Sequence, residues 1–184
     1  MAKDYDAAIV ASQEALALWR ALNAESVDVA VGLNSLARAE HLAGDHAAAE
    51  RDYGEALRIA RKINYRDGVA TYTGNLAELA LDREQWPEAE RLAREALALA
   101  EKLGRAELVG WDCQQIAVAL LRQGRPAEAL PFARRAVEIM AKLRYSGLDK
   151  ARQVLAECEA VVSVGGAGSP LAPLASTMLP PTLS

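Results

Sequence analysis

The stretch QWPEAERLAREALALAEKL, residues 85–103, decides the fold of this 184-residue chain. Its small and apolar positions recur at i, i+4, i+7, i+8 and i+11, which is one face of a helix with 3.6 residues per turn. These positions are Ala89, Ala93, Ala96, Leu97 and Ala100. The stretch therefore predicts an amphipathic helix whose buried face is built mainly from alanine.

Three further segments, residues 5–22, 46–63 and 126–143, repeat this helix. Three columns of small or apolar residues carry the register, and each column steps by 41, 40 and 40 positions. The columns are Ala8/Ala49/Ala89/Ala129, Ala15/Ala56/Ala96/Ala136 and Leu22/Ile63/Leu103/Leu143. A fixed period of this size is typical of stacked helical repeats, in which each unit packs only on its neighbours.

The columns also predict which side chains are buried. Ala89 and Ala96 stand in columns that hold only small side chains, so we expect both to lie between helices. Polar and charged residues dominate the columns of Gly54 and Pro131, so both should face solvent. Pro131 lies beyond the first turn of its helix and is expected to bend it.

Composition and charge limit the class of protein. The apolar share is 52% and the aromatic share only 5%, which favours closely packed helices over sheets rich in Val, Ile, Tyr and Phe. The formal net charge is −4 and no run of Lys or Arg is present, so the basic stripe of a nucleic-acid-binding protein is missing. We therefore expect no nucleic-acid partner.

Several features favour a cytoplasmic protein without a membrane partner. Cys113 and Cys158, the only cysteines, lie inside helical patterns, as expected of buried thiols in a reducing compartment. The first turn carries Lys3, Asp4 and Asp6 and lacks the apolar segment of a signal peptide. No uninterrupted apolar run reaches about 18 residues, so no membrane span is expected.

The repeats organise residues 1–162 into one all-α domain, an α-solenoid of about eight antiparallel helices. The expected units are residues 4–22, 26–63, 66–103 and 105–143, followed by a capping helix at 147–162. Residues 163–184 hold four of the seven prolines and no charged residue, so they are predicted to form a flexible tail. The alternative for this tail is an extended peptide that binds an aromatic groove.

The array begins with the second helix of a unit and ends with the first helix of another. The apolar face of the helix at 4–22 would normally rest on a preceding helix of its own unit. We therefore expect either that the chain is part of a longer protein, or that it forms a weak homodimer through this helix, with Ile9 and Leu16 near the contact.

The repeated pattern resembles the tetratricopeptide repeat, which pairs two helices in each unit. It reads Leu36-Ala37…Gly44-Asp45-His46…Ala49…Tyr53…Ala56, and Ala37, Ala77 and Ala117 precede Ala49, Ala89 and Ala129 by twelve positions, the spacing found in that family. The period of 40 exceeds the usual 34. It is similar to the long-period variant of kinesin light chains and of the repeat arms of bacterial signalling ATPases and transcriptional activators. The resemblance implies a superhelix of helical hairpins that binds proteins.

The resemblance also implies where a ligand would bind, because in this family the first helices of the units line the concave face. Carried over position by position, the lining is Asn34, Arg38 and His41, then Asn75, Glu78 and Asp82, then Trp111, Gln114, Gln115 and Arg122. Asn and Gln side chains offer a donor and an acceptor to a peptide backbone, and Trp111 offers an apolar anchor. The alternative is that these are ordinary solvated positions.

No catalytic or metal-binding pattern accompanies the repeats. His41 and His46 lie five apart across a turn, rather than at the i, i+4 spacing of two ligands on one helix. Cys113 has no His near it in sequence, which disfavours a nucleophile. We expect no enzyme activity, no metal and no cofactor.

The sequence thus predicts a non-enzymatic scaffold that binds a protein or peptide in the concave groove. The alternative is an oligomerising or sensor arm of a larger signalling protein, such as a STAND-type ATPase or a transcriptional activator. The fold itself does not decide between them, because the same scaffold serves many roles.

Overall fold

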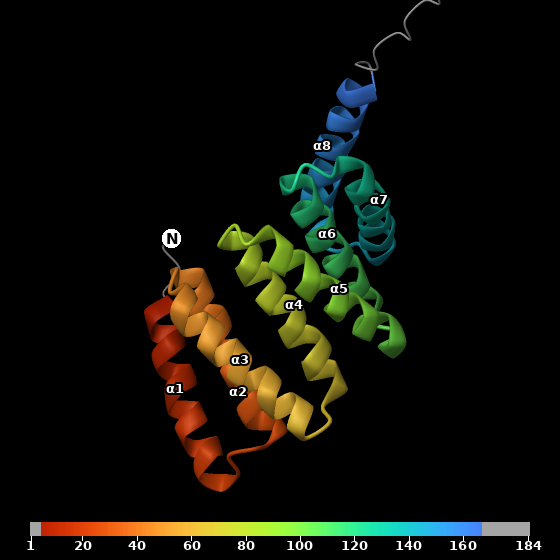
Figure 1. Ribbon diagram of the computed structural model, residues 1–184. Coiled ribbons are helices and arrows are strands. Elements are labelled where there is room, and N and C mark those ends of the chain that lie inside the picture. Colours follow the sequence, from red (N-terminus) through yellow and green to blue (C-terminus); the bar gives the residue numbers. More distant parts are fainter. Residues whose placement is uncertain (1–4, 167–184) are drawn as a thin grey trace, which may run out of the picture.

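The computed structural model describes residues 5–166, and within them the chain forms eight α-helices and no strand (Figure 1). The helices are α1 Tyr5–Leu22, α2 Val27–Ala43, α3 His46–Lys62, α4 Arg66–Asp82, α5 Trp86–Leu103, α6 Ala106–Arg122, α7 Pro126–Leu143 and α8 Leu148–Gly166. The predicted all-α fold of about eight helices is confirmed.

The last helix is longer than the sequence predicts. It continues past residue 162 to Gly166, and the hydroxyl of Ser163 donates a 2.8 Å hydrogen bond to the carbonyl of Glu159. The reason is that the first proline of this region is Pro170, so nothing before it removes a backbone donor. The rest of the expected tail, residues 167–184, lies outside the described residues.

Consecutive helices pack side by side and the hairpins stack in chain order, from α1 at one end to α8 at the other (Figure 1). The even-numbered helices α2, α4, α6 and α8 also contact one another in turn. Within residues 5–166 the odd-numbered helices make no such contacts with each other. In a curved stack the closest elements lie inside the curve, so the even-numbered helices form the inner surface and the odd-numbered helices the outer surface.

Each of the six turns from α2 to α8 contains one residue with left-handed backbone conformation. These residues are Gly44, Asn64, Glu84, Gly104, Gly124 and Arg144, with φ between 51° and 88°. The residue after each donates its N–H to the carbonyl five positions back, at 2.8–3.0 Å. This bond closes the end of the helix and fixes the direction in which the next helix starts.

The alanine columns lie where helices meet. From α3 onward every member of the two columns is fully buried, and these members are Ala49, Ala56, Ala89, Ala96, Ala129 and Ala136. The predicted burial of Ala89 and Ala96 is confirmed. Pro131 is exposed within α7, as predicted. Gly54 is half-buried rather than fully exposed, although no atom lies within 4 Å of where its Cβ would be.

The first helix packs on α2 through its apolar face. Leu16 is only 2% exposed, and a Cβ at Gly32 would lie 3.0 Å from Leu16 and 2.7 Å from the ring of Trp19. Ile9 is half-buried against the same cluster. Leu16 is therefore not free to contact a second chain, which corrects the expectation for that residue. The physical reason is that the helix after α1 covers this face.

Candidate functional site

The ten residues predicted to bind a ligand lie on α2, α4 and α6, which belong to the inner surface. Their exposure varies: Arg38, Asp82 and Arg122 are exposed, Asn34, Asn75, Glu78 and Trp111 are half-buried, and His41, Gln114 and Gln115 are buried. They separate into a group that links α2 to α4 and a group around a hollow farther along the stack.

The first group is held together by its own hydrogen bonds. Asn75 Nδ2 donates to Asn34 Oδ1 at 2.7 Å, and His41 Nε2 lies 2.8 Å from Asp82 Oδ2. Both bonds run from α2 to α4, so they stabilise the contact between neighbouring units. The buried ring of His41 also lies edge-on to His46, with ring centroids 5.5 Å apart. These side chains fix the shape of the inner surface.

The second group surrounds a hollow of about 210 Å³ between α4, α6 and α8. Six predicted residues line it, namely Glu78, Asp82, Trp111, Gln114, Gln115 and Arg122, and Leu81, Trp86, Val118 and Lys150 complete the lining. Sequence reasoning missed Trp86, which begins the second helix of its unit, and Lys150, which belongs to the helix interpreted only as a cap. Trp86 could have been found because it directly follows the turn after α4.

Two buried glutamines that line this hollow contain hydrogen-bonding atoms without a partner among the described residues. Gln114 is 4% and Gln115 is 3% exposed. Gln114 Oε1 and both Oε1 and Nε2 of Gln115 are buried without a hydrogen-bond partner among the described residues. Leaving such an atom unpaired costs about 1–3 kcal/mol, so buried polar groups are nearly always bonded. A donor and an acceptor on one amide match the C=O and N–H of a peptide.

The hollow carries charges of both signs on different helices. Glu78 and Asp82 come from α4, whereas Arg122 comes from α6 and Lys150 from α8. Burial raises the pKa of Glu78 above its usual range. Arg122 is also paired with Glu157, whose Oε2 lies 3.5 Å from its Nη1. This balance of charge suits the dipoles of a peptide backbone better than a ligand of high charge.

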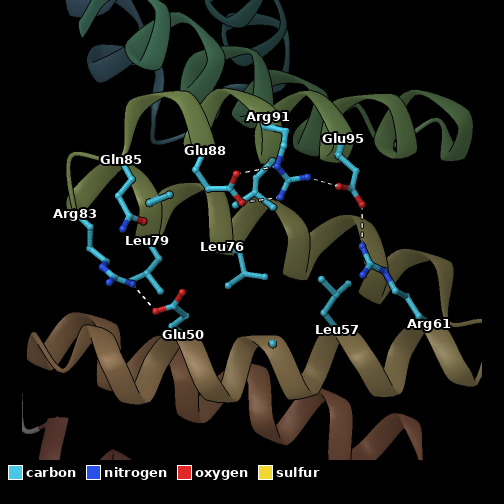
Figure 2. Close-up of a pocket in the computed structure, with 13 residues that line it drawn as sticks. Glu50, Leu57, Arg61, Leu76, Leu79, Arg83, Gln85, Glu88, Arg91 and Glu95 are labelled. Atoms are coloured by element: carbon cyan, nitrogen blue, oxygen red, sulfur yellow. Dashed lines mark hydrogen bonds and ion pairs between the residues drawn. The ribbon is translucent and has the colours of Figure 1, made fainter. Parts of the chain in front are cut away.

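Two of the larger hollows on the outer surface are lined mainly by polar and charged side chains. One of about 520 Å³ lies between α1, α2 and α3, and one of about 390 Å³ lies between α3, α4 and α5. Figure 2 shows the second, with Leu57, Leu76 and Leu79 directed into it. Its rim consists of ion pairs: Arg83 with Glu50, Arg91 with Glu88 and Glu95, and Arg61 with Glu95. Because these charged groups satisfy one another, volume alone does not mark a binding site here.

Other chemistry is limited in the described part of the chain. Burial raises the pKa of the Cys113 thiol to about 11, so it stays protonated at neutral pH. Residues 5–166 contain no group of three or more His, Cys, Asp or Glu side chains placed to hold a metal ion. Among the described helices, none combines the length and the apolar character needed to cross a bilayer.

Solved structures share this arrangement over most of the chain. The apo form of RapI superposes with a TM-score of 0.76 over 90% of this chain at 17% identity, and the chain spans 46% of RapI. The nearly identical TPR-like repeats of a Podosopora anserina protein assigned as a kinesin light chain give 0.71 at 19% identity, over 89% of this chain and 81% of that one. BtubC (BKLC) from P. vanneervenii gives 0.69 at 21% identity, over 99% of this chain and 82% of BtubC.

At these identities the likeness concerns the fold alone. No curated protein matches the chain in sequence. The model of the tetratricopeptide repeat family, however, matches residues 1–62 and 68–142, which together are more than half of the chain. The chain therefore belongs to the tetratricopeptide repeat family.

Proposed function

We propose that this chain is a protein-interaction module that binds an extended peptide segment in the hollow between α4, α6 and α8. The observation that carries the proposal is the buried amide of Gln115, whose donor and acceptor are both unpaired. Both atoms are covered in the unliganded chain, so the Gln115 side chain turns toward the hollow on binding. A peptide that lies along α6 then supplies a C=O to Nε2 and an N–H to Oε1. Because these bonds use only the backbone, they accept peptides of varied sequence.

An apolar contact and a rigid platform support the same proposal. The half-buried ring of Trp111 lies in the same lining as Leu81 and Val118, so an apolar side chain of the peptide has a surface to cover. The bond from Asn75 to Asn34 joins α2 to α4 before any ligand arrives. A site whose helices are already fixed loses less conformational entropy on binding.

The test is a peptide selected from a random display library on the wild-type chain, with its Kd measured by fluorescence anisotropy. Gln115→Met keeps the length of the side chain and removes its amide, and Trp111→Ala removes the anchor. We expect each to weaken binding by about tenfold. Gln153→Met, at an exposed position of α8 outside the hollow, is the matched control. An unchanged Kd for both site variants, or failure to select any peptide, would refute the proposal.

A second candidate function is self-association through α1. Four large apolar side chains of this helix are exposed, and Leu22 has the largest exposed fraction, 85%, followed by Leu18, Val10 and Trp19. Exposed apolar side chains gathered on one helix are typical of contact surfaces. This surface differs from the one near Leu16 that the sequence predicts, since Leu16 is covered by α2.

A further inference from the structure

A separate hollow of about 370 Å³ lies where the C-terminal ends of α3 and α5 meet the start of α4. Val69, Leu99 and Leu103 give it an apolar floor, and Arg61, Arg66 and Lys102 surround that floor with positive charge. It adjoins the outer hollow of Figure 2, because Arg61 lines both and pairs with Glu95 there. We call it the basic hollow.

Two of its three cations have no acidic partner within residues 5–166. Arg61 is paired with Glu95 at 2.8 Å, whereas neither Arg66 nor Lys102 forms an ion pair with any described carboxylate. Most of the arginines and lysines within residues 5–166 form ion pairs, and Arg66 and Lys102 belong to the minority that do not. A carboxylate brought to this place would gain attraction from both cations without displacing an internal partner.

The repeat itself supplies a comparison, because the same positions recur in the next unit. One period of 40 residues later, Glu101 stands in place of Arg61 and Ala106 in place of Arg66. Both changes remove positive charge from the equivalent place beside α6. The combination in the basic hollow is therefore not a by-product of the repeated fold.

Lys102 also differs from the lysines at the equivalent positions of the units before and after it. The equivalents of Lys102 are Lys62 in the unit before and Lys142 in the unit after. Lys62 is paired with Glu25, and Lys142 Nζ lies 2.7 Å from Glu138 Oε1. Of the three lysines, only Lys102 is left without a carboxylate in the part of the chain that the structure describes.

We propose that the basic hollow is a second docking site, which binds an acidic segment of a partner protein that presents an apolar side chain between carboxylates. The apolar side chain covers Leu99 and Leu103 on the floor, and the carboxylates approach Arg66 from α4 and Lys102 from α5. Complementary charge selects this partner over a neutral or basic one. The site lies on the outer surface and shares no residue with the hollow around Gln115, so both can be occupied together.

The probe is a fluorescein-labelled peptide of leucines flanked by glutamates, with its Kd measured by anisotropy at low and high salt. Matched peptides carry glutamines or lysines in place of the glutamates. The wild-type chain should bind the glutamate peptide at least about tenfold more tightly than either matched peptide, with the difference falling as salt rises. The double variant Arg66→Glu, Lys102→Glu should lose this preference and bind the lysine peptide instead.

Lys142→Glu, at the equivalent position one period later, is the control and should leave the Kd of the glutamate peptide within about twofold. Gln115→Met should also leave it unchanged, which separates this site from the inner hollow. Circular dichroism checks that every variant is folded. The proposal would be overturned if the three peptides bound with equal affinity, or if the glutamate peptide did not bind the wild type. An unchanged preference in the double variant would also overturn it. So would displacement of the glutamate peptide by decanoate, because the hollow would then accept a fatty acid rather than a protein segment.

Discussion

Asp112 on α6 allows a quantitative test of the packing between α4, α5 and α6. Its side chain is buried, with the residue only 2% exposed, and its Oδ2 has no hydrogen-bond partner among the described residues. Its Oδ1 lies 3.0 Å from the place where a Cβ at Gly74 would be, so the carboxyl group fits against the bare backbone of α4. Burial raises the pKa of Asp112 to about 8. We predict that Asp112→Asn changes how stability depends on pH.

The sign follows from the protons bound by each state. An aspartate in the unfolded chain has a pKa of about 3.9, so between about pH 4 and pH 8 the folded chain holds a proton at Asp112 that the unfolded chain has lost. The stability due to this proton is fully present below about pH 4 and is lost as the pH rises through about 8. The loss is about 1.4 kcal/mol per pH unit, which makes it on the order of 4 kcal/mol by pH 7.

The assay is urea unfolding of the wild type and Asp112→Asn at several values from about pH 5 to about pH 8. The wild type should lose stability relative to the variant by about 1.4 kcal/mol for each pH unit. Burial also raises the pKa of Glu40 to about 7, but Glu40 is present in both proteins, so the difference isolates Asp112. Asp149→Asn, at an exposed carboxylate, should leave the wild-type slope unchanged. Parallel curves for the wild type and Asp112→Asn would refute the reasoning.

Three further predictions concern packing and association. Ala96→Leu should destabilise the chain by about 1–3 kcal/mol, because the Cβ is fully buried between helices; an unchanged melting curve would contradict the assigned register. Gly54→Ala should raise the free energy of unfolding by about 0.5–1 kcal/mol, since its Cβ meets no atom; destabilisation in urea would show crowding instead. Leu18→Glu should abolish any concentration-dependent association seen by sedimentation of the wild type, and association that persists would exclude α1 as the contact.

The sequence predicted the helices well because residues one period apart occupy equivalent positions in successive units. Patterns that are weak in one unit are therefore repeated in the next. Residues 85–103 were expected as a helix, and α5 is Trp86–Leu103. The left-handed residue at Glu84 has no local signal, since glutamate rarely adopts that conformation. It does so because Gly44 and Gly124, one period away on either side, mark the same turn geometry, which stacking of the units imposes.

The binding surface was harder to predict because exposure depends on contacts between units. His41 and Asp82 are 41 residues apart, and only the packing of α2 on α4 brings them together. Helical periodicity alone could not show that Gln115 would be buried while Arg122, on the same helix, stays exposed. Comparing residues that lie one period of 40 apart is still useful, because it shows which positions differ between units that share one fold.

Residues that stabilise the contacts between units can therefore be distinguished from residues that are free to bind a partner. The even-numbered helices contact one another in turn, whereas the odd-numbered helices make no such contacts within residues 5–166 and leave hollows between them. A substitution at Ala96 changes a contact that every neighbouring unit needs, so it must alter stability. Arg66 and Lys102 form no ion pair within residues 5–166, so their replacement should alter binding while the free energy of unfolding stays nearly unchanged.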